Sequence, residues 1–518
     1  MKTLPLLTCI ASCAGIPSLT GYAKTDGGHS KKPNIIYILA DDLGRAELGR
    51  YGQQHIETPN IDALAENGMT FTNHYCGTAV SAPSRCVLFT GLHTGHAYIR
   101  GNDEIGSRGN VWDREAMLKD STLEGQRPLP AHTHTIPAAL KKAGYTTACI
   151  GKWGLGYPGS VSTPNKMGFD FFYGYNCQRQ AHDYFPPFLY RNESREYLSN
   201  PLRPFPNEKL DKGADPRDEK SYAKYWKGQY APDLMYKEII DFVVRSKEEP
   251  FVLFWTTPVP HLPLIAPERW VKHYVEKFGD EEPYDGRAGS LPCRYPHATY
   301  AAMVSYFDEQ IGGLIAKLKE LGLYDNTIIL FTSDNGPAFS GGSDSPWFDS
   351  AKPFKCEYSW GKAALREGGI RTPLVVSWPK RIKAGTQSGM ISAFWDMMPT
   401  FCDIAGVESP QTDGVSMLPE MLGKSAKQQQ HECLYWEYPE FGGMVAVRWG
   451  KWKAFIPQVQ KGNKTIELYD LEVDPREQTD VAKYHPDIVC KMKELIKTEH
   501  AEPELKWFDM PIEAICAE

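Results

Sequence analysis

The chain of 518 residues is 42% hydrophobic and 23% charged, which is typical of a soluble globular protein with one large domain and a second, large or small. Its net charge of −7 and its lack of basic runs argue against nucleic acid or an anionic membrane as partner, but not against an anionic sugar. The 12 cysteines include no C-x-x-C pair and no zinc-ligand spacing, so neither a disulfide nor a zinc site is predicted.

Residues 1–23 are predicted to be a signal peptide. Lys2 provides a weak basic end, residues 4–16 are largely apolar, and residues 21–23 offer small side chains for cleavage. The apolar part is too short for a transmembrane helix, and no later stretch is long and apolar enough to be one. Export to the periplasm is therefore predicted. Residues 10–13 also resemble a bacterial lipoprotein processing site, so lipidation at Cys13 is the alternative.

The first predicted strand of the mature chain covers residues 34–39, a short apolar run rich in β-branched side chains. Asp41 and Asp42 follow at its C-terminal end, where α/β sheets place their ligand sites. Taken separately, two aspartates after a strand are also typical of a helix cap or a turn.

Residues 79–91 read AVSAPSRCVLFTG, and they predict a helix that begins near Ser81. Pro83 suits the first turn of a helix, so Ser81 would lie at an N-terminus, where free N–H groups favour an anion. Arg85, one turn on, could hold that anion through its fork of donors. By itself the segment also fits a loop before a buried helix, with Arg85 in a structural ion pair.

A second motif, GYTTACIGKWGL, covers residues 144–155. It follows a predicted helix that Thr135 could cap and Pro137 could start, and it contains a predicted strand over 146–150 that leads to Lys152. The two motifs together resemble the signatures of the type I sulfatases, the formylglycine-dependent branch of the alkaline phosphatase superfamily.

The resemblance implies that Ser81 is oxidised after synthesis to an aldehyde, 3-oxoalanine, whose hydrate attacks the sulfur of the substrate. A serine at this position implies a bacterial maturase that works without oxygen, acting in the cytoplasm before export. The resemblance further implies that Lys152 binds the sulfate and the hydrate.

The second motif departs from the family pattern at Gly154, where sulfatases usually have a histidine that takes a proton from the hydrate. His182, in a small-residue/His/Asp segment, is the predicted substitute by resemblance. A polar loop histidine is the alternative interpretation. His261 follows a predicted strand over 251–255 and matches the family histidine that contacts the bridging ester oxygen, where a general acid would stand.

A predicted strand over 326–332 ends in Ser333, Asp334 and Asn335. With Asp41 and Asp42, these side chains would form an all-oxygen cage for a hard cation, and Ca²⁺ suits it better than Mg²⁺ because it tolerates looser geometry. The resemblance implies the same calcium ligands, with Ser81 added. It also implies that Lys362 is a second sulfate-binding lysine. Ca²⁺, Arg85, Lys152 and Lys362 would then supply positive charge as the S–O bond breaks.

Strands alternate with helices up to about residue 406, and a one-faced helix over 300–321 should pack on the sheet. We therefore expect an α/β catalytic domain over 33–425, with a large doubly wound mixed sheet flanked by helices. Short strands at 444–447, 452–456 and 465–468 and a helix near 487–497 indicate a small antiparallel sheet plus helix over 426–518. The resemblance implies the same alkaline phosphatase-like architecture.

The expected substrate is an O-sulfated sugar, since exported bacterial sulfatases mostly serve glycan breakdown. The Gly-Lys-Trp-Gly segment resembles sulfatases that act on galactose or N-acetylgalactosamine sulfates, from host or algal glycans. Aromatic and polar loop residues are candidates for sugar contacts, although each could equally be a capping or packing residue: residues 178–190, His93, His96, Arg100, Asn102, Trp436, Glu437, Tyr438 and Phe441.

Two other functions compete with this one. A phosphatase, phosphodiesterase or phosphonate hydrolase of the same superfamily would use an unmodified Ser or Thr and two zinc ions, and the few histidines near strand ends count against it. A non-catalytic sulfoglycan-binding protein would need only the charges of the pocket and the calcium, and Gly154 is the reason to consider it.

Overall fold

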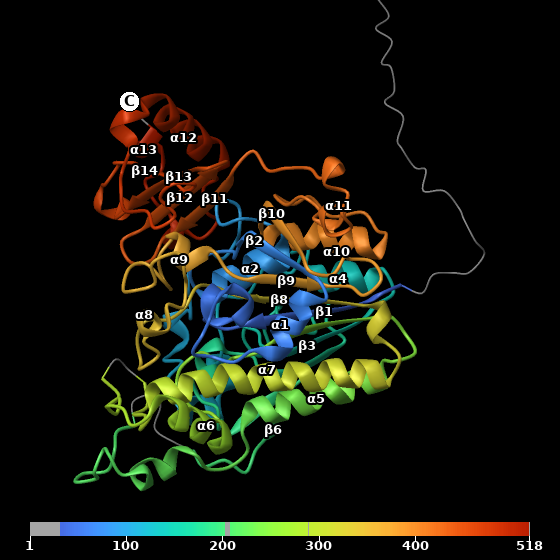
Figure 1. Cartoon of the computed structure of the whole chain (residues 1–518), viewed down its shortest axis with the longest axis vertical. Coiled ribbons are helices and arrows are strands. Elements are labelled where there is room, and N and C mark those ends of the chain that lie inside the picture. The colour runs from blue at the N-terminus through green and yellow to red at the C-terminus, as the bar shows by residue number, and fades with distance from the viewer. Residues whose placement is uncertain (1–31, 203–207, 288–289, 517–518) are drawn as a thin grey trace, which may run out of the picture. The chain divides into compact units, whose positions relative to one another are not determined.

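The computed structural model describes residues 32–202, 208–287 and 290–516, and the described residues from Lys32 on make one compact unit. The predicted signal peptide and Cys13 lie outside the described residues. The unit contains a large sheet between two layers of helices and a smaller sheet built from the C-terminal part of the chain (Figure 1).

The large sheet is mixed, as predicted. Its parallel centre is formed by β8, β1, β7, β3 and β4, and β9 and β5 run opposite to the other strands. In spatial order the strands are β10 (Thr386–Ala393), β2 (Met69–Tyr75), β9 (Leu374–Ser377), β8 (Thr327–Ser333), β1 (Asn34–Ala40), β7 (Phe251–Thr256), β3 (Thr146–Lys152), β4 (Phe171–Tyr175), β5 (Phe188–Arg191) and β6 (Ser194–Tyr197).

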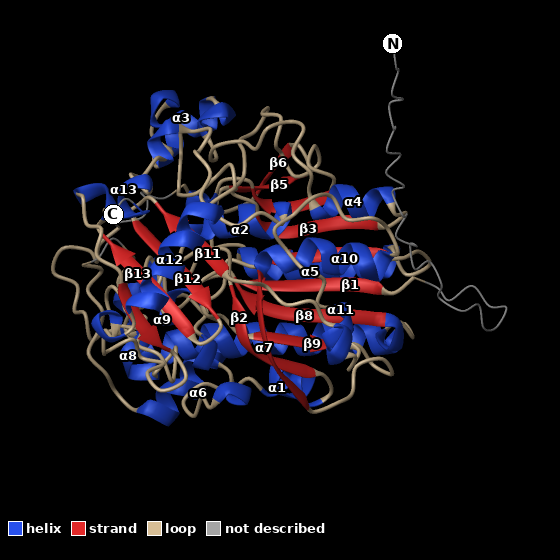
Figure 2. Cartoon of the chain, turned by 90° about the horizontal axis from the view of Figure 1, so that it is seen from above, coloured by secondary structure: helices blue, strands red, loops and turns tan. Residues whose placement is uncertain are grey.

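Both faces of this sheet are buried, which explains why its central strands read as continuous apolar runs. In β1, Ile35, Tyr37 and Leu39 face one core, whereas Ile36 and Ile38 face the other. The first core is closed by α2 (Ser81–Thr90), α4 (Ile136–Lys142) and α10 (Met397–Ala405), and the second by α1 (Pro59–Glu66), α5 (Ala231–Arg245) and α7 (Pro296–Glu320) (Figures 1 and 2).

Helix α7 begins four residues before the predicted start because Pro296 occupies its first turn, where a missing N–H costs nothing. Its apolar side chains at Met303, Phe307, Ile311 and Leu314 are buried against the sheet, as the one-faced pattern predicts. Helix α6 (Glu268–Phe278) packs on α7, and α3 (Arg114–Lys119), α8 (Ser345–Phe348), α9 (Glu367–Ile370) and α11 (Leu418–Met421) are short.

The smaller sheet is antiparallel, in the order β11 (Leu434–Tyr438), β12 (Met444–Trp449), β13 (Trp452–Pro457) and β14 (Glu467–Asp470). Its outer face packs on α12 (Pro486–Glu499) and α13 (Glu513–Cys516). Strand β11 was not predicted. Its Leu434, Trp436 and Tyr438 belong to the first core of the large sheet, so the smaller sheet is joined to the large one through shared apolar contacts.

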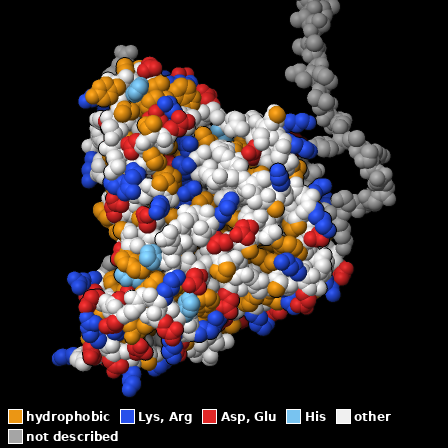
Figure 3. Space-filling model, in the orientation of Figure 1, with side chains coloured by type: hydrophobic (Ala, Val, Ile, Leu, Met, Phe, Trp, Pro, Cys, Tyr) orange, Lys and Arg blue, Asp and Glu red, His pale blue; other side chains and the backbone are white. Residues whose placement is uncertain are grey.

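The described cysteines are free thiols. Among the described helices, none has the length and apolar character needed to cross a membrane. On the face drawn in Figure 3, basic and acidic side chains are interspersed.

Candidate active site

The candidate site lies where the C-terminal ends of the central strands meet at one edge of the large sheet. Because β1, β8, β7 and β3 are parallel, the residues that follow them come together there. Asp41 and Asp42 follow β1, Asp334 follows β8, and Lys152 ends β3. All four side chains are buried.

Three carboxylates are thus packed side by side. The Asp42 N–H donates to Asp334 (3.2 Å), and the Asn335 amide donates to Asp42 (2.8 Å). Burial and the Asp41 charge raise the pKa of Asp334 to about 6. Burial alone would also raise the pKa of Asp41, but Lys152, His261 and Arg85 hold that pKa well below its usual range.

These residues fit a hard divalent cation. The Oδ1 atom of Asn335 is buried and has no hydrogen-bond partner among the described residues, as expected of an oxygen meant for another ligand. Ligand atoms of Asp41, Asp42 and His261 lie within 4.8 Å of one another. Asp41, Asp42, Asp334 and Asn335 would hold a metal through oxygen, which is the donor set that calcium and magnesium prefer.

Ser81 lies at the first turn of α2, as predicted. Its Oγ donates to Asp41 Oδ1 (3.0 Å) and lies 3.3 Å from Lys152 Nζ. Ser84 Oγ donates to the carbonyl of Asp334 (2.5 Å) and accepts from Gly77 N–H (3.0 Å), which ties the start of the helix to the end of β8. Lys152 also donates to Asp41, and burial lowers the pKa of this lysine although Asp41 opposes that effect.

Arg85 lies behind Ser81 and is fully buried. Its guanidinium donates to the Lys152 carbonyl (2.9 Å) and to Asp334 Oδ2 (3.2 Å). The structure therefore places Arg85 where it orients Lys152 and Asp334, and the expected contact with sulfate stays a prediction.

His261, His182 and Lys362 complete the cluster. His261 Nδ1 donates to the Leu262 carbonyl (2.8 Å), which leaves Nε2 facing Asp42 Oδ2 at 3.5 Å. The His182 and His261 rings meet edge to face, with centroids 4.3 Å apart. Burial lowers the pKa of both histidines. Lys362 Nζ lies 2.7 Å from Asp42, and Asp42 and Asp41 hold its pKa above the ordinary value although burial opposes them.

A pocket of about 300 Å³ opens over this cluster. Six predicted site residues line it: Ser81, Asn102, Lys152, His182, His261 and Lys362. Phe441 and the start of segment 178–190, Gln178 and Arg179, line it as well, in keeping with the expected sugar subsite. Phe339 and Glu440 were missed, because nothing in their local sequence distinguishes them from ordinary loop residues.

Four of the predicted sugar contacts do not line this pocket. Arg100, Trp436 and Glu437 are fully buried: Arg100 pairs with Glu437 (2.9 Å), and the Trp436 indole donates to the Cys76 carbonyl (3.2 Å). His96 pairs with Asp413 (2.9 Å) beside His93. Arg100, Trp436 and Glu437 join the smaller sheet to the large one, which matches the alternative interpretation of these residues as packing residues. The role of His96 in sugar binding stays a prediction.

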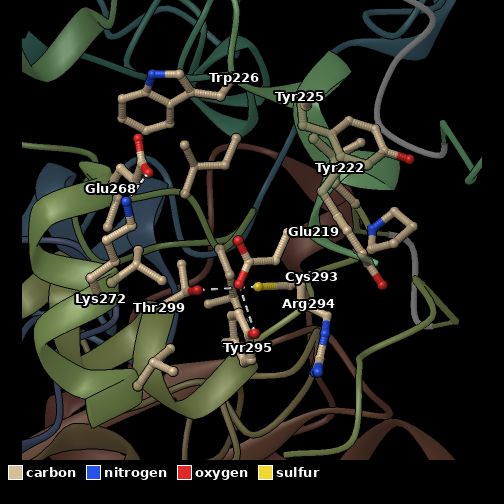
Figure 4. Close-up of a pocket in the computed structure, with 18 of the residues that line it drawn as sticks. Glu219, Tyr222, Tyr225, Trp226, Glu268, Lys272, Cys293, Arg294, Tyr295 and Thr299 are labelled. Atoms are coloured by element: carbon tan, nitrogen blue, oxygen red, sulfur yellow. Dashed lines mark hydrogen bonds and ion pairs between the residues drawn. The ribbon is translucent and has the colours of Figure 1, made fainter. Parts of the chain in front are cut away.

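Gly154 has φ +79°, a conformation that favours glycine, and a side chain there would point at Gln178. A second cavity, of about 450 Å³, lies beside α6 and is lined by aromatic, apolar and charged side chains, among them Trp226, Glu268 and Lys272 (Figure 4). It contains none of the predicted site residues.

A family model described as sulfatase matches residues 33–407, and a model described as the C-terminal part of N-sulphoglucosamine sulphohydrolase matches residues 356–502. The chain belongs to the sulfatase family. It is accordingly a sulfuric ester hydrolase, as predicted.

Individual relatives agree with this assignment. The sulfatase is 28% identical to an N-acetylgalactosamine-6-O-sulfatase of Bacteroides thetaiotaomicron, over 96% of this chain and 98% of the relative. It is 30% identical to the human N-acetylgalactosamine-6-sulfatase, over 76% and 67% of the two chains. The crystal structure of Ps i-CgsB superposes with a TM-score of 0.70 and 26% identity, covering 92% of this chain and 94% of that one.

Proposed function

We propose that this sulfatase hydrolyses O-sulfated carbohydrates, and in particular the 6-O-sulfate ester of N-acetylgalactosamine in host or algal glycans. The observation that carries the proposal is the position of Ser81, whose Oγ is within reach of both Asp41 and Lys152 at a helix N-terminus. The sugar is suggested by the names of the Bacteroides and human relatives, together with the Gly-Lys-Trp-Gly segment at 151–154.

The proposed nucleophile is made from Ser81. A maturase of the oxygen-independent serine type oxidises the Ser81 CH2–OH group to an aldehyde by removing two electrons and two protons. Water adds to the aldehyde and forms a geminal diol. A serine hydroxyl alone is a weak nucleophile, and the diol offers two hydroxyl groups for two successive steps.

In the first step one diol hydroxyl releases its proton to water, and its oxygen forms a bond to sulfur while the bond between sulfur and the sugar oxygen breaks. Lys152 and Lys362 line the pocket and hold the sulfate oxygens, where negative charge is concentrated. His261 presents Nε2 toward the same space. Because its Nδ1 proton is engaged with the Leu262 carbonyl, His261 acts as the acid in its doubly protonated form, which Asp42 and Asp41 favour against the effect of burial on its pKa, and it gives the Nε2 proton to the departing sugar oxygen.

In the second step the remaining diol hydroxyl loses its proton, the carbon–oxygen bond to the sulfate breaks, and the aldehyde is restored. His182 is the proposed proton acceptor because it lines the pocket beside His261. Its pKa is well below the ordinary value, mainly through burial and the neighbouring His261, so the ring is neutral near pH 7 and able to accept a proton.

The proposed cofactor is Ca²⁺, held by Asp41, Asp42, Asp334 and Asn335, with the modified residue 81 as a further ligand. When bound, the cation neutralises the packed carboxylates and withdraws charge from a sulfate oxygen. The fit rests on the oxygen donors and on the unpaired Oδ1 of Asn335.

The protein is further proposed to be exported to the periplasm by residues 1–23, with lipidation at Cys13 as the alternative. Oxidation of Ser81 would precede folding, because the serine lies on a buried helix once the chain has folded. It would also precede export, because the proposed maturase acts in the cytoplasm. Protein made in cells with its leader intact should therefore carry the aldehyde in both its cytoplasmic precursor and its exported form.

The test combines the mass of the peptide that spans Ser81 with sulfate release from defined esters. Protein made with a serine-type maturase should carry the aldehyde and release sulfate from N-acetylgalactosamine 6-sulfate faster than from the 4-sulfate. Phosphate release with an unmodified serine would instead indicate a phosphatase of the same superfamily. An unmodified serine with no turnover of either ester would indicate a sulfoglycan-binding protein.

A further inference from the structure

Exposed aromatic rings lie at the mouth of the active-site pocket. Phe441 lines the pocket and is 60% exposed, and Tyr358 is 69% exposed. Exposing large apolar side chains to water is unfavourable, because burying them would stabilise the protein. A cluster of them at a binding site therefore indicates a surface that a ligand covers.

Phe441 is held in place by its loop, which joins β11 to β12. Its φ of +54° is unfavourable for a bulky residue, and Gln458 Nε2 donates to the Phe441 carbonyl (3.0 Å). Gly443 is hydrogen-bonded through its carbonyl to Val459 N–H (3.0 Å). A strained backbone that is fixed by its neighbours and exposes a phenyl ring indicates a prearranged surface rather than a flexible loop.

A second aromatic surface is formed by Phe339 and Tyr358. Phe339 lines the pocket, and the Tyr358 ring meets it edge to face, with centroids 5.0 Å apart. This contact extends the apolar surface from the pocket wall outward to an exposed tyrosine.

We propose that Phe441 and the Phe339–Tyr358 pair bind the sugar ring next to the sulfated one, by contact with its apolar face. The inference rests on the proposed function. The pocket of about 300 Å³ is at the lower end of the range for ligand sites, so the remainder of a glycan chain runs over the rim. The surface is continuous with the pocket, and aromatic side chains suit the C–H faces of a pyranose.

The experiment compares two substrates in the matured enzyme: N-acetylgalactosamine 6-sulfate, and a disaccharide with that sugar at its non-reducing end. The ratio of kcat/KM for the disaccharide to that for the monosaccharide should fall about 2- to 10-fold in Phe441→Ala or Tyr358→Ala, and further in the double variant. Tyr484→Ala is the control, because Tyr484 is 68% exposed and does not line the pocket.

Binding is measured in parallel by calorimetry with Ser81→Ala, which cannot be matured. A ratio that is unchanged in the double variant, or a disaccharide that binds no more tightly than the monosaccharide, would overturn the rim proposal. If the matured enzyme with wild-type sequence releases no sulfate from either substrate, the proposed specificity fails, and the binding comparison still decides the role of the rim.

Discussion

At the scale of single residues, the site depends on one close approach between strands. Gly151 has φ +131°, and a Cβ there would lie 1.9 Å from the Thr256 carbonyl oxygen, so only glycine lets β3 approach β7 at this point. Lys152 follows directly, and its carbonyl accepts from Arg85 (2.9 Å) and Thr256 Oγ1 (2.9 Å). These bonds fix the backbone that aims the Lys152 ammonium at Asp41.

Ser81→Ala should abolish sulfate release because the proposed nucleophile is built from the serine hydroxymethyl group. The thermal midpoint should stay within a few degrees of the original, since Ala is compatible with a helix and only the two hydrogen bonds of Ser81 Oγ, with Asp41 and Lys152, are lost. Sulfate release is measured by ion chromatography and folding by calorimetry. A variant with a rate near that of the starting protein would contradict the proposed mechanism.

His182→Ala and His261→Ala should fail at different steps. Without His182, the first sulfuryl transfer stays fast, the sugar appears in a burst, and a sulfated residue 81 accumulates. Without His261, the burst itself is slow because the sugar oxygen leaves without a proton. Rapid-quench kinetics with intact-protein mass spectrometry distinguishes the two. Loss of affinity alone in His182→Ala, with no trapped ester, would make His182 a sugar contact.

At the scale of elements, the ends of β1 and β8 bring three carboxylates together, so the thermal stability of the protein should depend on a bound cation. A chelator should lower both sulfate release and the thermal midpoint, because Asp41, Asp42 and Asp334 are then left as close like charges. Ca²⁺ should restore both more fully than Mg²⁺ does. Unchanged melting after metal removal verified by elemental analysis would argue against the site.

Helix α2 carries Ser81 at one end and stops at Gly91 at the other, where φ is +73°. Gly91→Ala should cost more stability than the backbone strain of about 1–2 kcal/mol, because the new Cβ would lie 2.8 Å from Thr412. Gly144→Ala is a matched control: its φ is +85°, but the space around it is open, so strain alone applies. Urea unfolding of both variants should separate the clash from the strain, and equal losses would show that the clash relaxes.

At the scale of the whole described unit, the smaller sheet is joined to the large one by buried charges as well as by apolar contacts. Lys453 on β13 lies 3.0 Å from Glu367 on α9 and 3.1 Å from Glu477, and all three side chains are buried. Burial raises the pKa of Glu367, but neighbouring cations hold it at about 2, and Lys453 lowers it more than the others do.

Lys453→Met should therefore destabilise the fold, by up to about 3–5 kcal/mol, because it removes the cation that two buried carboxylates share and leaves Arg371 beside Glu367 and Arg366 beside Glu477. Lys451→Met is the control: its ion pair with Asp470 is partly exposed, so its loss should change stability little. Chemical denaturation followed by fluorescence measures both. Similar small effects in the two variants would mean that the buried network rearranges around the missing charge.

The sequence by itself predicts those features of this protein that depend on residues close together in the chain. The apolar runs before Asp41 and Asp334 predict buried parallel strands, and Ser81 and Pro83 predict a helix N-terminus, because such features follow from residues a few positions apart. Parallel pairing then brings the strand ends to one edge.

Tertiary structure alone decided which polar and aromatic residues face the pocket. Trp436 and Glu437 were plausible sugar contacts, but both are buried. Segments distant in the chain cover β11: the regions of Cys76 and Thr94, more than 300 positions earlier, and His500, about 60 positions later. Glu440 and Phe441, a few residues further, turn at the hairpin and reach the pocket. Burial depends on contacts between distant segments, and the period of a short strand does not show which face those segments will cover.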